Sequence, residues 1–136
     1  MPVYIEPMNT LILDGKAIEG ERVNGEMFGG FCDCGGVMLQ KAVFRGNERN
    51  VILSECERCW KNRAMVFEDE NVSVRDVEVI NRGRIREFLG EFLSESELEA
   101  VKDKARGRDY SYASFSKAKK KIENMGLDIS ELMRLL

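Results

Sequence analysis

The chain contains no histidine, and several kinds of site are therefore excluded at once. Serine–histidine and cysteine–histidine catalysis cannot occur within it, and neither can a metal site with an imidazole ligand. No apolar run approaches the roughly 18 residues that a membrane-spanning helix needs. The first residues also lack the basic and then apolar pattern of a signal peptide. We therefore expect a cytoplasmic protein with no membrane partner.

Glutamine is almost absent as well, with a single residue, whereas glutamate and arginine are abundant. This bias is typical of proteins from hot environments, and it indicates a thermophile. The 136 residues are 43% hydrophobic and 33% charged, with a net charge of -3. That length gives room for one or two small domains but not for a large enzyme core. Because both signs of charge are mixed, a polybasic tail and an acidic disordered segment are excluded.

The four cysteines are Cys32, Cys34, Cys56 and Cys59, arranged as a C-x-C pair, 21 residues, and a C-x-x-C pair. Two close pairs at about this separation have the spacing of a tetrahedral four-cysteine zinc site. The segments 37–44, 51–53 and 64–67 favour strands, and residues 45–49 favour a turn, so a hairpin would bring the two pairs together. Gly35 follows the second cysteine, where a tight turn commonly needs a positive φ angle.

Residues 28–69 thus resemble the zinc-ribbon superfamily, in which cysteine-bearing turns alternate with strands. The first pair departs from the usual C-x-x-C, and Trp60 rather than glycine follows the second pair. The resemblance implies a structural zinc ion and a fold that often occurs in transcription, translation and RNA-processing proteins. It implies no single activity.

Other uses of the four thiols stay open. A rubredoxin-type iron centre also has four cysteines, a redox C-x-x-C needs only Cys56 and Cys59, and disulfides need an oxidising compartment. Zinc is favoured because nothing in the sequence indicates secretion or a thioredoxin-like context, and because a rubredoxin-type centre normally has C-x-x-C on both sides. The bases Lys41, Arg58, Lys61 and Arg63 either compensate the charge of the thiolates or are ordinary surface residues.

Catalysis is not expected of this site. A catalytic zinc keeps one coordination position open for water, and four cysteines would fill all four positions. No carboxylate pair and no glycine-rich phosphate loop stands out elsewhere in the chain. We therefore expect a protein that is not an enzyme.

The pattern changes along the chain from strand-like to helical. Asp-Gly and Asn-Gly turn signals divide residues 3–28 into short strands, whereas the valines of residues 70–81 fit either a last strand or a linker. From residue 82 the apolar residues follow a helical period, and Ser94 and Glu97 form a capping box. The fold class is therefore α+β. An antiparallel β module with a four-cysteine zinc ribbon (residues 1–81) precedes a bundle of three or four helices (residues 82–136).

Basic residues are concentrated in the second part. Residues 102–121 hold 8 Lys and Arg against 2 Asp and Glu, across two predicted helices and their connection. The outline suggests a helix-turn-helix in which the last of these helices faces DNA or RNA. The candidate nucleic-acid contacts are Arg106, Arg108, Lys117, Lys120, Lys121 and Asn124. Lysine is also the usual residue on the solvent-exposed face of any helix. The alternative of a helical bundle that binds no nucleic acid therefore stays open.

Two functions follow from these patterns. The first is a zinc-containing nucleic-acid-binding protein, such as a transcriptional regulator. The second is a protein-interaction adaptor or accessory subunit of a transcription or translation assembly. Its contact surface would be apolar and would lie on the strands or on Leu132–Leu136, which could also pair two copies into a homodimer.

Overall fold

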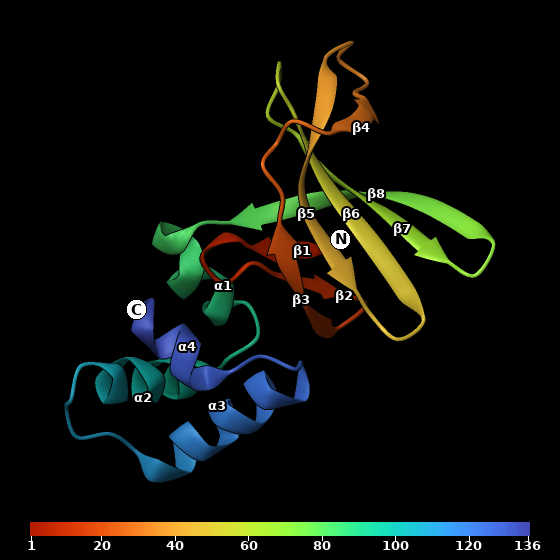
Figure 1. The fold of residues 1–136 in the computed structure, drawn as a ribbon. Helices are drawn as coiled ribbons and strands as arrows, with labels where there is room; N and C mark the ends of the chain where they lie inside the picture. Colours follow the sequence, from red (N-terminus) through yellow and green to blue (C-terminus); the bar gives the residue numbers. More distant parts are fainter. The chain divides into compact units, whose positions relative to one another are not determined.

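A computed structural model of the protein describes residues 1–136 and divides into two compact units (Figure 1). The first unit contains residues 1–14 and 18–79 and is built of strands. The second contains residues 80–136 together with residues 15–17, and it is mainly helical. None of its helices combines the length and the apolar composition needed to span a bilayer.

The strand unit is a β-barrel. Its strands are β1 (Val3–Ile5), β2 (Thr10–Leu13), β3 (Lys16–Arg22), β4 (Phe28–Phe31), β5 (Val37–Arg45), β6 (Arg49–Cys56), β7 (Asn62–Glu68) and β8 (Asn71–Ile80), with a 3₁₀ turn at Glu6–Met8. They are hydrogen-bonded in the order β3-β2-β1-β8-β7-β6-β5-β4. An additional pairing of β3 with β5 closes every strand except β4 into a ring of seven.

The barrel interior follows from the alternation of side chains along the strands. Its buried core consists of Tyr4, Leu11, Leu13, Ala42, Phe44, Val51, Leu53, Ala64, Val66 and Val77. The β5–β6 register shifts between Gln40 and Ala42, which leaves Lys41 as the extra residue of a bulge. Beyond this bulge Met38 pairs with Cys56, and together with Cys32 these two residues form a separate small cluster. The bulge therefore separates the barrel core from the cysteine-bearing end of β5 and β6.

The zinc-ribbon resemblance is wrong at the level of the fold. The hairpins β5–β6 and β6–β7 exist as a ribbon would require, but they are neighbours in a closed seven-stranded barrel. The sheet contains β1, β2, β3 and β8 as well, and residues 71–80 form a long strand rather than a linker. A ribbon buries little apolar surface by itself, whereas here the same strands surround a core to which the N-terminal segment also contributes.

The helical unit consists of a 3₁₀ turn (Arg82–Arg84), α1 (Ile85–Gly90), α2 (Glu95–Ala105), α3 (Tyr112–Asn124) and α4 (Ile129–Arg134). The predicted capping box is confirmed: the Glu97 amide donates to Ser94 Oγ at 3.2 Å, and the Ser94 amide donates to Glu97 Oε1 at 2.8 Å. The buried side chains of the four helices include Ile85, Leu89, Val101, Ala118, Ile122 and Leu132. They form one stripe on each helix and account for the core of this unit.

The helix-turn-helix interpretation is also wrong, because α2 and α3 lie antiparallel. Lys121 near the end of α3 pairs with Glu97 near the start of α2, with Nζ and Oε1 2.7 Å apart. At the opposite end, Lys104 Nζ of α2 lies 4.4 Å from the ring centroid of Phe115 in α3. A recognition helix crosses its predecessor after a turn of three or four residues, whereas here residues 106–111 connect two helices that run side by side.

Candidate metal centre and basic surface

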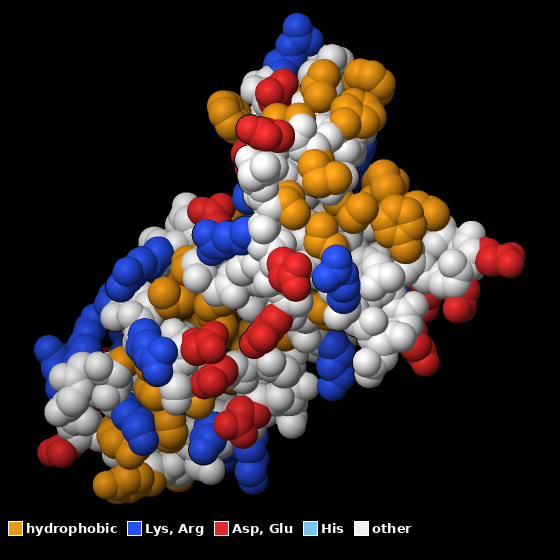
Figure 2. Space-filling view, viewed as in Figure 1, with side chains coloured by type: hydrophobic (Ala, Val, Ile, Leu, Met, Phe, Trp, Pro, Cys, Tyr) orange, Lys and Arg blue, Asp and Glu red, His pale blue; other side chains and the backbone are white.

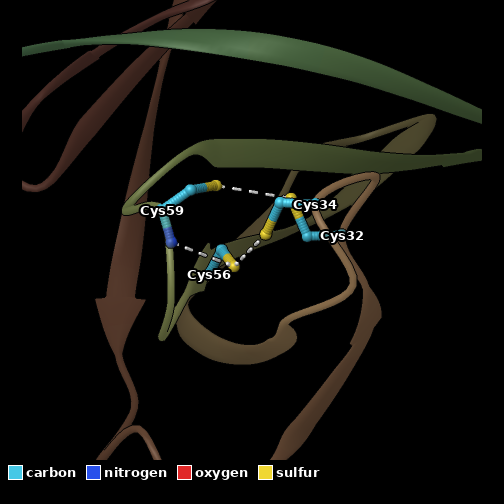
Figure 3. Close-up of side chains that lie close together, drawn as sticks. All are labelled: Cys32, Cys34, Cys56 and Cys59. Atoms are coloured by element: carbon cyan, nitrogen blue, oxygen red, sulfur yellow. Dashed lines mark hydrogen bonds between the residues drawn. The ribbon is translucent and has the colours of Figure 1, made fainter.

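The four cysteines lie close together, as Figure 3 shows. Cys32 and Cys34 lie in the turn between β4 and β5, Cys56 is the last residue of β6, and Cys59 lies in the turn before β7. Their four Sγ atoms all lie within 4.8 Å of one another. The two predicted pairs therefore converge although 21 residues separate them in the sequence.

The distances suit one tetrahedral ion. Cys32 Sγ lies 3.5 Å from Cys59 Sγ, and Cys34 Sγ lies 3.5 Å from Cys56 Sγ. When four sulfurs surround one Zn²⁺ as a tetrahedron, each about 2.3 Å from the ion, neighbouring sulfurs are about 3.8 Å apart. This spacing falls between the two 3.5 Å contacts and the upper limit of 4.8 Å for all four atoms. All four thiols are free rather than joined in disulfides.

Backbone amides point at two of the sulfurs. The Gly36 amide lies 3.4 Å from Cys34 Sγ, and the amides of Arg58 and Cys59 lie 3.4 and 3.5 Å from Cys56 Sγ. Such donors stabilise a thiolate. The Cys59 amide, supported by that of Arg58, lowers the pKa of Cys56 to about 6 although burial opposes this shift.

The ionisation of one thiol disfavours that of the others. The Lys61 amide lowers the pKa of Cys59, but the hydrogen bond with Cys32, burial and the two remaining thiols together raise it to about 12. Cys56 and Cys59 therefore differ in their tendency to ionise. A dication among them would remove this difference, because it stabilises every thiolate.

Glycines make the approach of the two turns possible. Gly35 has the predicted positive φ, at 87°. A Cβ on Gly36 would lie 2.7 Å from Cys56 Sγ and 3.3 Å from Cys34 Sγ, so only glycine leaves space for both sulfurs there.

The basic side chains near the cysteines interact with backbone carbonyls and carboxylates rather than with the sulfur atoms. Arg58 donates to the Cys34 carbonyl at 3.1 Å, and Arg63 donates to the Phe31 carbonyl at 2.9 Å. Lys61 pairs with Asp76 at 3.2 Å, which raises the pKa of the lysine, and Lys41 pairs with Glu55 at 3.0 Å. Arg58 thus connects the two cysteine-bearing turns, and the other three bases connect segments on either side of them.

The predicted nucleic-acid contacts do not form one group. Lys117, Lys120 and Lys121 line a hollow of about 570 Å³ together with Ser94, Ser96, Glu97 and Ser114. Arg106 and Arg108 lie in the connection before α3, whereas Asn124 is its last residue. A helix of 13 residues is about 20 Å long, so the two arginines and Asn124 lie at its opposite ends.

Sequence reasoning missed two further features of the strand unit. Hydrophobic side chains gather on the surface over β4 and the adjoining part of β7 and β8 (Figure 2), and Phe28 and Phe31 are 57% and 68% exposed. Near the cysteines, Trp60 is 69% exposed and adopts a φ of +65°. The only sequence signal for this second feature is the presence of Trp60 where a ribbon would have glycine.

Comparison with known proteins gives a family but no activity. Residues 1–80 match the model of the AF0631-like N-terminal beta-barrel domain, and residues 82–134 match that of the AF0631-like C-terminal four-helix domain. An uncharacterized protein of Archaeoglobus fulgidus is 42% identical over 130 residues, which cover 95% of this chain and 94% of that protein. No solved structure matches the chain. The family models together cover nearly the whole sequence, and the chain therefore belongs to the AF0631-like family, with its N-terminal β-barrel and C-terminal four-helix domains.

Proposed function

We propose that the protein binds one structural Zn²⁺ through Cys32, Cys34, Cys56 and Cys59. The convergence of four free thiols within 4.8 Å supports this proposal. Soft thiolate ligands in a tetrahedral set suit zinc, which has no redox chemistry of its own. Four protein ligands leave no position for water, so the ion would hold the turns together rather than catalyse a reaction.

Metal analysis of the purified, reduced protein tests this proposal. We expect one zinc per chain, replaceable by Co²⁺ with the visible absorption of a tetrahedral thiolate complex. Cys56→Ser should abolish both signals, whereas Asp33→Asn, which removes an exposed carboxylate between two ligands, should leave them unchanged. Protein without bound metal would refute the proposal, and bound iron would identify the rubredoxin-type alternative.

We propose further that the helical unit binds nucleic acid through the phosphates. The observation that carries this proposal is the hollow between α2 and α3, where lysine ammonium groups and serine hydroxyls face one space. Lys117 and Lys120 are exposed and have no acidic partner, whereas Lys119 on the same helix lies 3.9 Å from Glu123. Unpaired ammonium groups are available to replace the counterions of a phosphate backbone.

Lys121 has a different role within this surface. Its ammonium group is held by the buried Glu97 carboxylate at 2.7 Å, so much of its charge is already neutralised. Lys121 therefore fixes α3 against α2, and Lys117 and Lys120 are the residues free to contact phosphate. Contacts of this kind position a backbone and carry no sequence information directly.

Electrophoretic-shift titration over a series of salt concentrations tests the nucleic-acid proposal, with random duplex and single-stranded probes. The double variant Lys117→Gln and Lys120→Gln should bind more weakly, and its salt dependence should be shallower by about 0.9 for each phosphate that is no longer neutralised. Lys119→Gln is the matched control, because it removes a paired charge from the same helix. Equal binding by the double variant and the control, or no binding by the unmodified protein at low salt, would refute the proposal.

A further inference from the structure

The side chain of Trp60 contributes little to the stability of the turn in which it lies. It is 69% exposed, so its large ring buries little surface. Its φ of +65° lies in the left-handed region, which glycine adopts without strain and a bulky residue does not. The backbone is held there from both sides, because the Trp60 amide donates to the Cys56 carbonyl and Asn62 donates to the Trp60 carbonyl, each at 3.1 Å. An exposed and strained residue that the fold does not need points to a role in binding.

Trp60 also lines a pocket of the strand unit. The pocket has a volume of about 490 Å³, within the range of small-molecule and side-chain sites. The residues of its lining that matter here are Val23, Leu39, Lys41, Glu55, Glu57 and Trp60. The apolar members of this set suit the aliphatic part of a long side chain, and Trp60 offers an aromatic surface.

The charge of the pocket favours a cation. Lys41 and Glu55 neutralise one another across 3.0 Å, whereas Glu57 is exposed and forms no ion pair. Among the carboxylates and amines of the lining, which also includes Trp60, one negative charge is therefore unbalanced, and Cys56, a proposed zinc ligand in the same lining, adds no positive side chain. Residues 1–81 as a whole hold 9 Lys and Arg against 14 Asp and Glu, so the surrounding unit does not oppose a cation either. Carboxylate and indole together are the partners of a guanidinium group, which stacks on an aromatic face and binds a carboxylate through two donors.

We propose that this pocket binds an arginine side chain of a partner protein. The guanidinium would stack on Trp60 and pair with Glu57, and its methylene groups would lie against Leu39 and Val23. This interaction would give the alternative adaptor role a defined partner chemistry. It is independent of the nucleic-acid contact proposed for the helices, because the two surfaces share no residue.

Trp60 is the only tryptophan of the chain, so emission excited at wavelengths beyond the absorption of the three tyrosines reports on this pocket. The probe is the peptide acetyl-Gly-Arg-Gly-Arg-Gly-amide, titrated into the full-length reduced protein at constant ionic strength. The same peptide with citrulline at both arginine positions has nearly the same shape without the charge. We expect a saturable change in emission with the arginine peptide and binding of the citrulline peptide that is about fivefold weaker or more.

Variants separate the pocket from general electrostatics. Glu57→Gln should weaken binding of the arginine peptide by about fivefold, whereas Glu48→Gln, which removes an exposed carboxylate from the β5–β6 turn, should leave it unchanged. Circular dichroism confirms that both variants are folded. Equal affinity for the two peptides, an unchanged affinity in Glu57→Gln, or an emission change with oligothymidylate and none with the arginine peptide would overturn the proposal.

Discussion

Glu97 connects two helices through a single buried carboxylate, and its removal gives a sharp test of how the helical unit is held together. The side chain is 4% exposed. Its Oε1 accepts from Lys121 Nζ at 2.7 Å and from the Ser94 amide at 2.8 Å, so one atom caps α2 and attaches α3 to it. The Lys121 ammonium group, followed by the Ser94 amide, lowers the pKa of Glu97 from 4.5 to about 2.

The lowered pKa gives the size of the effect. A shift of this size corresponds to at most about 3.5 kcal/mol of stability, because one pKa unit is about 1.4 kcal/mol. Lys121 is half exposed, and screening by water reduces the figure to about 2 kcal/mol. Because the folded pKa lies below the unfolded one, this stability is fully present above the unfolded pKa of 4.5. It is lost as the pH falls from there towards 2.

Urea unfolding followed by far-ultraviolet circular dichroism measures this contribution. Glu97→Gln should lower the free energy of unfolding by about 2 kcal/mol near neutral pH and by much less near pH 2, where about half of the native carboxylate is itself protonated. Glu99→Gln is the control, since Glu99 is exposed and its contact with Lys102, at 3.4 Å, lies on the helix surface. A double-mutant cycle with Lys121→Met isolates the pair. Equal effects of Glu97→Gln and Glu99→Gln, or a difference that persists unchanged at low pH, would refute this reasoning.

Three further predictions concern the barrel. Trp60→Gly should raise the free energy of unfolding of the barrel by about 1 kcal/mol, because glycine relieves the left-handed backbone strain and little buried surface is removed. A lower melting temperature of this variant would contradict the prediction. Tyr4→Phe should lower the stability by about 1 kcal/mol in urea titration, because the hydroxyl donates to Asn9 Oδ1 at 2.7 Å; an unchanged midpoint would show that water replaces the bond. A chelator, which would remove the proposed Zn²⁺, should lower the melting temperature of the barrel, and an unchanged melting curve would show that the turns need no ion.

The two cysteine-bearing turns and the start of α2 could be predicted because short-range chemistry determines them. Two close pairs of thiols, a glycine at a turn and a serine–glutamate capping box are each contained within a few residues. The structure has Gly35 at positive φ and the box at Ser94 and Glu97, as expected. Such features depend on local backbone geometry and little on the rest of the chain.

The barrel could not be predicted, because a period of two identifies strands but not their partners. The turn signals within residues 3–28 predict short strands, yet nothing in them indicates that β3 pairs with β5 or that β1 lies beside β8. Likewise, the apolar stripes of α2 and α3 fit both a crossing pair and an antiparallel pair. The contact of Lys121 with Glu97, which decides between them, joins residues 24 positions apart.

The closure of the barrel has a consequence for synthesis on the ribosome. β1 is made first, but its neighbour β8 is completed only at Ile80. The edge of β1 that pairs with β8 therefore stays unpaired until most of the strand unit has emerged from the ribosome. β5, β6 and β7 are adjacent in sequence and can assemble before that moment, together with all four thiols. Loop-closure entropy makes the late, long-range pairing the slow event. A nascent chain that has emerged from the ribosome only as far as the β7–β8 turn would therefore already hold the cysteine cluster while its N-terminal strands were still open to nonspecific pairing.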